Sequence, residues 1–238
     1  MISINIDSYY GGKEASGVPQ AIINQIPPHQ IYIEPFLGRG TIMRYKKPAP
    51  LHNIGSDLNR DLVTKWQYSN TPDNFIIHCQ DGISLLEHLC SNTIFIDVGS
   101  QVFVYLDPPY LIETRQTPRK VYKHEFSRED HIRLLNIAIK LPFTVAISCY
   151  DNSLYQEHLK EWRKITFPSQ TRKGTAMETL YMNYPEPCAL HDYTYLGKDY
   201  RERERIRQKI KRHIEGLKRL PLYECQAIIE AITRIETD

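Results

Sequence analysis

The chain has 238 residues, of which 41% are hydrophobic, 24% charged and 11% aromatic, and its formal net charge is +2. This ordinary globular composition excludes a disordered chain and a fibrous repeat. No apolar run reaches the roughly 18–20 residues that cross a bilayer, and the first residues lack the pattern of a secretory signal. Five widely spaced cysteines without a Cys-x-x-Cys pair indicate free thiols, so we expect a cytoplasmic protein without a metal site.

The middle of the chain predicts short strands that alternate with helices. The expected strands are Ile31–Glu34, Phe75–His78, Val102–Asp107, Phe143–Cys149 and Glu178–Tyr184. The expected helices are Leu58–Tyr68, Gly82–Cys90, Arg128–Leu141 and Ser153–Arg163, the third with a capping box at Ser127 and Asp130. Near-continuous apolar strands between helices indicate an α/β fold with a mostly parallel sheet flanked by helices. Because such folds bind ligands beyond the carboxyl ends of their strands, functional residues are expected directly after each apolar run.

Two apolar runs lie too close together for both to be parallel strands. Thr93–Val98 and Val102–Asp107 are separated only by Gly99–Gln101, whereas a parallel pair needs a crossover of about a dozen residues or more. We assign Val102–Asp107 to the sheet. Thr93–Val98 is then a hairpin partner at an edge or no strand.

The C-terminal part differs from the body in charge and in pattern. Residues 198–219 hold ten basic and four acidic residues, a net +6 that leaves −4 for the rest of a chain whose total is +2. Two apolar stripes flank Pro221; their members are Ile206, Ile210, Ile214 and Leu217, then Leu222, Cys225, Ile228, Ile229, Ile232 and Ile235. The pattern predicts a basic helical hairpin over residues 191–238 after a body of residues 1–190. A polyanionic partner and a solvated helix with Glu–Arg pairs explain the charge equally well.

The strongest chemical signal directly follows an apolar strand, at Asp107-Pro108-Pro109-Tyr110. The two prolines stiffen the backbone and remove two N–H donors, so carbonyl oxygens point outward without ladder partners. The Asp107 carboxylate beside such a carbonyl offers two converging acceptors, which suit an amino group with two hydrogens to donate. Tyr110 adds a flat face on which a base can stack. The competing interpretation is a strand-ending turn followed by a surface tyrosine.

A glycine-containing loop follows the first predicted strand. It reads Glu34-Pro35-Phe36-Leu37-Gly38-Arg39-Gly40-Thr41. Its two glycines let the backbone approach a ligand where a Cβ would clash. The loop is neither the Gly-x-Gly-x-x-Gly dinucleotide fingerprint nor a phosphate-binding P-loop. An ordinary turn explains it as well as a ligand site does.

Two further acidic residues, Asp57 and Asp81, are candidate ligand contacts. Asp57 lies 23 residues after Glu34, near the spacing at which an acid holds ribose hydroxyls in dinucleotide-binding folds, and Asp81 follows Phe75–His78 and could accept from an adenine amine. Each acid alone is better explained as a helix N-cap. Together they outline a nucleoside pocket. Near the N-terminus, the segment Tyr9–Lys13 combines aromatic residues, a glycine pair and a cation. The glycine pair either allows close approach of the backbone to a ligand or forms only a turn.

In this order the motifs resemble those of the Dam-type adenine-specific DNA methyltransferases. The resemblance covers about residues 8–185 and also includes the segments Ile147–Asn152 and Glu178–Tyr184. It implies a Rossmann-like methyltransferase sheet that binds S-adenosyl-L-methionine (SAM). The implied cofactor residues are Tyr10, Gly11, Lys13, Glu34, Pro35, Phe36, Gly38, Gly40, Asp57, Leu58, Asp81, Gly82 and Asp107. The chain departs from larger relatives in two ways: only 26 residues separate Asp81 from Asp107, where those relatives carry a target-recognition domain, and Arg39 stands between the glycines.

The resemblance further implies methyl transfer to the 6-amino group of an adenine extruded from duplex DNA. Asp107, Pro108, Pro109 and Tyr110 would be the catalytic residues: Tyr110 stacks on the base, while the Asp107 carboxylate and the Pro108 carbonyl accept the amine hydrogens. No metal ion is needed. Alternatives are a methyltransferase acting on RNA or on the cytosine amine, and a catalytically idle DNA-binding protein. A nicotinamide-dependent oxidoreductase fits less well, because it would need the three-glycine fingerprint.

Double-stranded DNA as a partner requires cations near the catalytic motif. The expected DNA contacts are Arg115, Arg119, Lys120 and Lys123 in the segment 111–128, and Arg172 and Lys173 in the segment 170–174. Each segment alone is also explained as a solvated loop, but its position beside the catalytic strand ends favours contact with DNA phosphates. The sequence leaves open the recognition site, the oligomeric state and whether a partner restriction enzyme exists.

Overall fold

The computed structural model describes residues 17–91, 101–115, 123–171 and 174–235. The chain divides into two compact units, Met1–Thr194 and Tyr195–Asp238. The expected boundary after residue 190 falls earlier than this division. The difference has a local cause, since the His191 N–H donates to the Ile26 carbonyl and the Asp192 carboxylate accepts from the Lys47 N–H, both in the first unit.

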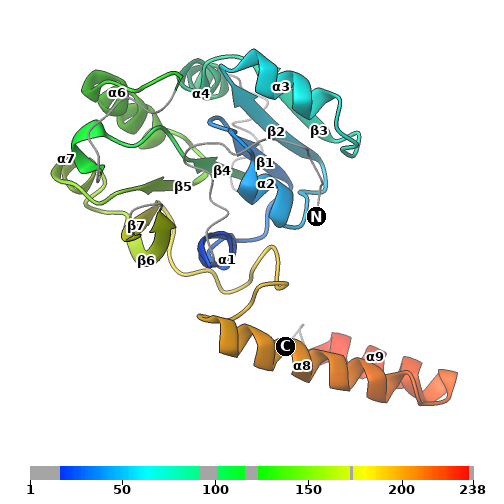
Figure 1. The fold of residues 1–238 in the computed structure, drawn as a ribbon. Coiled ribbons are helices and arrows are strands. Elements are labelled where there is room, and N and C mark those ends of the chain that lie inside the picture. The colour runs from blue at the N-terminus through cyan, green and yellow to red at the C-terminus, as the bar shows by residue number, and fades with distance from the viewer. Residues whose placement is uncertain (1–16, 92–100, 116–122, 172–173, 236–238) are drawn as a thin grey trace. The chain divides into compact units, whose positions relative to one another are not determined.

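The first unit is built on one seven-stranded sheet with the strand order β3-β2-β1-β4-β5-β7-β6 (Figure 1). Its strands are β1 (Ile31–Glu34), β2 (His52–Asp57), β3 (Phe75–Cys79), β4 (Val102–Leu106), β5 (Thr144–Cys149), β6 (Arg163–Thr171) and β7 (Gly174–Met182). Strands β1 to β5 pair in parallel, whereas β7 pairs antiparallel with both β5 and β6. The prediction of an α/β fold with a mostly parallel sheet is confirmed.

Helices flank this sheet and cover its central strands. They are α1 (Val18–Ile23), α2 (Thr41–Tyr45), α3 (Arg60–Gln67), α4 (Gly82–Ser91), the 3-10 turn η2 (Ile112–Thr114), α6 (Arg128–Ala138) and α7 (Ser153–His158). Ile33 and Val104 join a core cluster with residues of α4, α6 and α7, while Tyr32 and Phe103 stack at 6.1 Å between ring centroids. Because side chains alternate along a strand, the two pairs lie on opposite faces. Both faces are therefore buried, which explains the near-continuous apolar runs.

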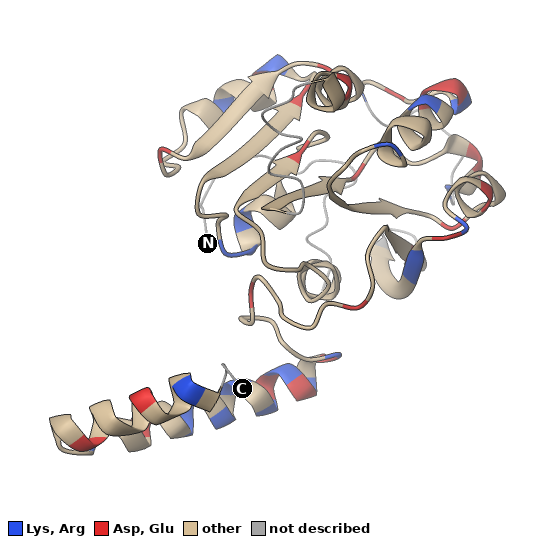
Figure 2. Cartoon of the chain, turned by 180° about the vertical axis from the view of Figure 1, so that it is seen from behind, with Lys and Arg blue, Asp and Glu red and all other residues tan. Residues whose placement is uncertain are grey.

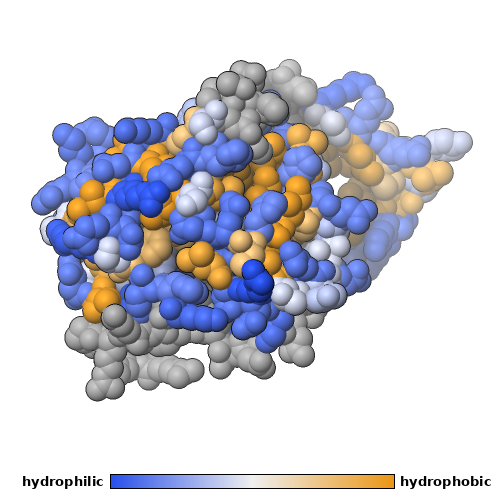
Figure 3. Space-filling view, turned by 90° about the horizontal axis from the view of Figure 1, so that it is seen from above, coloured by the Kyte–Doolittle hydropathy of each residue, from blue (hydrophilic) through white to orange (hydrophobic). Residues whose placement is uncertain are grey.

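Most predicted elements have the expected type, with shifted ends. The capping box at α6 is confirmed, because the Asp130 N–H donates to the Ser127 hydroxyl and the Ser127 N–H donates to the Asp130 carboxylate. The predicted helix Ser153–Arg163 ends at His158, and Arg163 instead begins β6. The question posed by Thr93–Val98 lies outside the described residues. On the face seen from above the view of Figure 1, apolar side chains lie between hydrophilic ones (Figure 3).

The second unit consists of α8 (Tyr200–Leu217) and α9 (Leu222–Ile235), which confirms the expected pair of helices. Asp199 caps α8 by accepting the Glu202 N–H. Lys and Arg residues are interspersed with Glu residues along α8 (Figure 2), and three cation–carboxylate pairs form within the helix. These surface pairs match the interpretation of a solvated helix, and they leave the helix with more cations than acids.

Candidate active site

A cavity opens at the carboxyl ends of β1, β2 and β4, where a parallel sheet is expected to bind ligands. Its empty space, including open solvent at the mouth, is about 850 Å³. It is lined by residues 34–42, 57–59, 81–82 and 107–109, and by Lys123, His124 and Phe126. The predicted cofactor residues on this wall are Glu34, Pro35, Phe36, Gly38, Gly40, Asp57, Leu58, Asp81, Gly82 and Asp107. Tyr10, Gly11 and Lys13 lie outside the described residues.

The glycine loop between β1 and α2 depends on both of its glycines. Gly38 and Gly40 have φ values of 49° and 58°, in the left-handed region that side chains disfavour. A Cβ on Gly40 would lie 2.3 Å from the Trp66 ring, so no larger residue fits there. The Trp66 indole N–H also donates to the Gly38 carbonyl at 3.3 Å. The loop is thus held with its backbone against the cavity.

Asp57, at the end of β2, links this loop to the next strand. Its carboxylate accepts the Gly38 N–H at 2.9 Å and the Asn59 N–H at 2.7 Å. Burial raises the pKa of Asp57 above its usual value, and these backbone hydrogen bonds oppose the shift. A carboxylate has about four lone-pair positions, so two backbone bonds leave acceptors for ligand hydroxyls. Contact between Asp57 and a ribose stays a prediction.

The interpretation of Asp81 as a helix N-cap is confirmed, and its contact with an adenine amine stays a prediction. Asp81 lies on the cavity wall, and one of its oxygens accepts from the Ser84 N–H at 2.8 Å and the Ser84 hydroxyl at 2.9 Å in the first turn of α4. The adjacent Gly82 is sterically required, because a Cβ there would lie 2.5 Å from the Pro35 carbonyl oxygen. This close approach packs the start of α4 against the glycine loop.

Glu34 is a buried acid at the bottom of the site. It accepts the Tyr32 hydroxyl at 2.9 Å and the Met43 N–H at 3.2 Å. Burial raises the pKa of Glu34 to about 8, and the negative charge of Asp107 adds to the shift. Glu34 is therefore mostly protonated at neutral pH. In that state Asp107 does not face a second full negative charge from this side chain.

The predicted catalytic motif is divided between the cavity and the protein interior. Asp107, Pro108 and Pro109 line the cavity, whereas Tyr110 is only 6% exposed. The Tyr110 hydroxyl donates to Glu178 on β7 at 2.9 Å, and its ring meets the Tyr150 ring edge-on at 4.7 Å. The segments Ile147–Asn152 and Glu178–Tyr184, which carry the resemblance further along the chain, thus hold Tyr110 in place.

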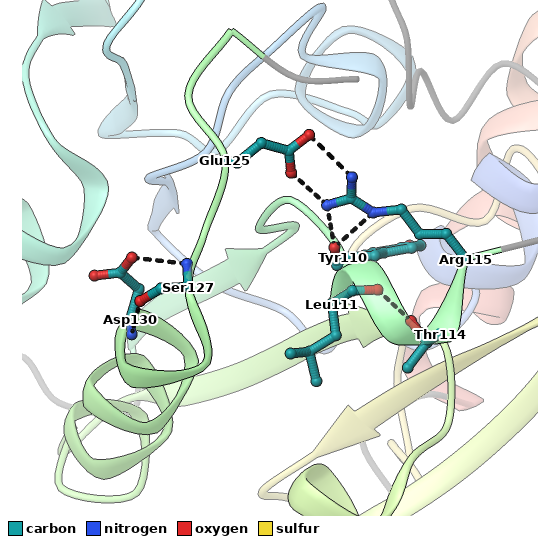
Figure 4. A network of polar contacts seen from close by, with 7 residues as sticks. All are labelled: Tyr110, Leu111, Thr114, Arg115, Glu125, Ser127 and Asp130. Atoms are coloured by element: carbon teal, nitrogen blue, oxygen red, sulfur yellow. Dashed lines mark hydrogen bonds and ion pairs between the residues drawn. The ribbon is translucent and has the colours of Figure 1, made fainter. Parts of the chain in front are cut away.

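Arg115 occupies a different position from the one expected. Its guanidinium hydrogen-bonds to the Tyr110 carbonyl and forms a two-pronged ion pair with Glu125 (Figure 4). Its side chain is 4% exposed. The prediction that Arg115 contacts DNA phosphate does not fit this arrangement, because its guanidinium is buried and bound to protein acceptors. The presence of Glu125 ten residues further along the same segment was the sequence signal that could have indicated an internal ion pair for Arg115.

The residues after the motif form part of the cavity wall, which the sequence did not indicate. Lys123, an expected DNA contact, lines the cavity together with His124 and Phe126. The Phe126 ring packs edge-on against Phe36 of the glycine loop at 5.4 Å. The other expected DNA contacts, Arg119, Lys120, Arg172 and Lys173, lie outside the described residues.

Asn59 is a further wall residue that sequence analysis did not single out. Its side-chain oxygen is buried, and no hydrogen-bond donor reaches it within the described part of the chain. The spacing Asp57-x-Asn59 was the signal that could have found it. A buried acceptor on the wall needs a donor, which a polar ligand can supply.

The cavity suits SAM chemically. The Asp57 and Asp81 carboxylates can accept from ribose hydroxyls and the adenine amine, and the glycine loop brings backbone close to a ligand. Phe36 and Leu58 supply apolar surface, and the acidic lining suits a cationic sulfonium.

In the described ranges, no group of three or more His, Cys, Asp or Glu is arranged to hold a metal ion. The helices traced in the structure include none that is both long and apolar enough to cross a membrane.

The chain is similar in fold to several solved structures. One is a precorrin 8w decarboxylase from Methanobacterium thermoautotrophicum (12% identity, TM-score 0.43, covering 73% of this chain and 92% of that chain). Another is a SAM-dependent methyltransferase from Anabaena variabilis (12% identity, TM-score 0.40, covering 67% of this chain and 76% of that chain). A third is a SAM-dependent methyltransferase from Agrobacterium tumefaciens (9% identity, TM-score 0.40, covering 70% of this chain and 60% of that chain). No curated protein matches the chain.

A family model described as the D12 class N6 adenine-specific DNA methyltransferase matches residues 9–94 and 83–173. These ranges contain the glycine loop, the acids at the strand ends and the Asp107–Tyr110 motif. The match confirms the resemblance found in the sequence, the Rossmann-like methyltransferase fold and, with them, SAM as the cofactor. Since the matched ranges span most of the chain, it belongs to the D12 class N6 adenine-specific DNA methyltransferase family.

Proposed function

We propose that this SAM-dependent methyltransferase transfers a methyl group to the exocyclic 6-amino group of an adenine in duplex DNA. One observation carries the proposal: Asp107 and Pro108 line the same cavity as the glycine loop, Asp57 and Asp81. The acceptors for an amino group therefore lie beside the residues that suit the cofactor. Since the adenine amine is paired and stacked inside a duplex, the base must be extruded to reach this cavity, at a cost of a few kcal/mol.

The chemistry follows from what the motif offers to the amine. SAM supplies a methyl group bound to a positively charged sulfur. The Asp107 carboxylate and the Pro108 carbonyl accept the two amine hydrogens, which draws the nitrogen lone pair out of conjugation with the ring and toward that methyl group. When the nitrogen bonds to the methyl carbon, the carbon–sulfur bond would break and the sulfur would keep its electron pair. The Asp107 carboxylate would stabilise the positive charge on the nitrogen until the surplus amine proton passes to it or to solvent. Catalysis rests on positioning and electrostatics and requires no covalent nucleophile.

Tyr110 is the proposed stacking partner of the extruded adenine. Its ring plane is fixed at two points, by the hydroxyl bond to Glu178 and by the edge of Tyr150. Because the ring is only 6% exposed, stacking requires its neighbours to move aside as the base enters, and a ring already fixed loses little side-chain entropy on binding. Glu178 and Tyr150 therefore support the base-binding role without contacting the reacting atoms.

Contact with DNA is assigned to basic side chains. We propose phosphate contacts from Arg119, Lys120, Arg172 and Lys173, together with the basic helix α8. Lys123, which is exposed and lines the cavity mouth, is placed to contact either the cofactor or the extruded nucleotide. Cytoplasmic location, as expected from the free cysteines, belongs to the same proposal.

The test is transfer of a tritiated methyl group from SAM to adenine-unmethylated duplex DNA, followed by analysis of the nucleosides. We expect the label in N6-methyladenine. Label found only in cytosine, or only when RNA replaces DNA, would contradict the adenine assignment. DNA binding without any transfer, from a chain that still binds SAM by calorimetry, would show the catalytically idle alternative.

A further inference from the structure

The side chain of Arg115 joins two parts of the site that the sequence presents as separate. Its Nε donates to the Tyr110 carbonyl at 2.8 Å, and Nη2 also donates to that carbonyl. Nη1 and Nη2 donate to the two Glu125 oxygens at 2.9 and 2.6 Å. Figure 4 shows the guanidinium between the carboxylate on one side and the backbone oxygen on the other. One planar group thus holds two acceptors at fixed distances.

The carbonyl on one side belongs to the catalytic motif. Pro108 and Pro109 have no N–H groups, so the motif lacks the backbone donors that normally fix a turn. Arg115, five residues further along the chain, supplies donors from outside the motif. Arginine suits this task because its donors have a rigid, planar geometry.

The carboxylate on the other side belongs to the cavity wall. Glu125 lies between His124 and Phe126, both of which line the cavity, and its side chain is only 12% exposed. Phe126 in turn packs on Phe36 of the glycine loop. A ligand that contacts this wall is therefore connected to Glu125 through its chain neighbours. Glu125 in turn is connected to the Tyr110 carbonyl through the hydrogen bonds of Arg115.

We propose that Arg115 and Glu125 are positioning residues that couple the cofactor cavity to the Asp107–Tyr110 motif. A filled cavity holds the 124–126 wall in place, and the ion pair transmits that order to the turn that receives the target base. The inference rests on the proposed function only in taking Asp107–Tyr110 as the base-binding motif.

Two conservative variants test the coupling. Arg115→Lys keeps the charge but loses the planar two-pronged geometry, and Glu125→Gln keeps the size but loses the charge. We expect each to lower kcat for methyl transfer by about 10²-fold, as small misplacements of reacting groups do, with little change in KM for unmethylated duplex DNA. SAM affinity, measured by calorimetry without DNA, should weaken several-fold in both.

The matched controls are Arg133→Lys and Glu87→Gln. Arg133 and Glu87 form another two-pronged Arg–Glu pair, which joins α6 to α4 but is about half exposed and does not line the cavity. These controls should leave kcat and SAM affinity within about twofold of the wild type. The proposal is overturned if Arg115→Lys and Glu125→Gln lower only the melting temperature and leave kcat and SAM affinity like the controls. A wild-type protein inactive on DNA would remove the proposed function, while the calorimetric comparison would still decide the coupling.

Discussion

Two basic segments look alike in sequence and differ in structure. The segment that follows the catalytic motif contains Arg115, whose side chain is 4% exposed and bound to Glu125. Helix α8 contains Arg207, whose side chain is 65% exposed although it also pairs with a glutamate, Glu204. Both arginines count equally in the net charge. Burial decides whether such a cation organises the interior or faces an external anion.

The largest effect is expected at the motif that the buried arginine supports. Asp107→Ala removes the carboxylate that contacts the amine in the proposed transition state. Single-turnover methyl transfer should fall by about 10²–10³-fold or more, with circular dichroism unchanged. Glu113→Gln, in the exposed Glu113–Arg128 pair nearby, is the control and should keep the wild-type rate. A near-normal rate for Asp107→Ala would remove Asp107 from its assigned role.

The comparison becomes sharper when the two arginines are replaced in the same way. Arg115→Ala leaves Glu125 and the Tyr110 carbonyl in the interior without their partner, so unfolding free energy should fall by about 3–5 kcal/mol. Arg207→Ala breaks a surface pair and should cost less than about 1 kcal/mol. Urea denaturation of both variants measures the difference. Equal losses would show that burial does not separate the two segments.

Glu34 is a buried acid whose pKa is set more by burial than by a nearby cation. Its pKa in the folded protein, about 8, lies above the ordinary 4.5, so its burial favours the protonated form. The protein should therefore lose stability as pH rises from about 4.5 to 8. In Glu34→Gln this loss should be reduced by about 2–3 kcal/mol between pH 5 and pH 7.

Thermal unfolding at several pH values tests this expectation. Lys46, whose pKa burial lowers to about 7, acts in the opposite direction, since its neutral form is favoured in the folded protein and stability rises from about pH 7 to 10.5. The comparison is therefore made below pH 7. Parallel pH profiles of the wild type and Glu34→Gln would show that Glu34 titrates normally.

The smallest effect on the reaction is expected from the basic helices. Deleting residues 198–238 should weaken binding to all DNA sequences similarly and leave the preferred target unchanged, because phosphate contacts carry little sequence information. Each lost contact should change the slope of log K against log salt by about 0.9. If the truncated protein has a lower melting temperature but the same slope, the helices are structural and have no DNA role.

The sequence predicted the elements whose burial follows from local pattern. β1 was placed correctly because all four of its residues are buried in an apolar run. β2 was missed because its sequence, HNIGSD, is largely polar. Its buried Asn53 bonds to the backbone of Ala49, and its Ser56 hydroxyl donates to the Pro35 carbonyl. Such partners depend on tertiary structure, which hydropathy does not report.

The same division holds for the site. The predicted cofactor residues within the described ranges line one cavity because motifs after parallel strands meet at one edge of the sheet. The contact between Tyr110 and Glu178, and the wall formed by His124 and Phe126, required the fold, because their partners are distant in sequence. Arg115 was assigned to DNA because composition records its charge but not its pairing with Glu125.

The salt dependence of DNA binding by Arg115→Gln tests the central comparison most directly. If Arg115 acts inside the protein, this variant should bind duplex DNA with the same slope of log K against log salt as the wild type, while methyl transfer falls. If Arg115 instead contacts a phosphate, the slope should become shallower by about 0.9. That result would contradict the assignment of this arginine to the interior of the site.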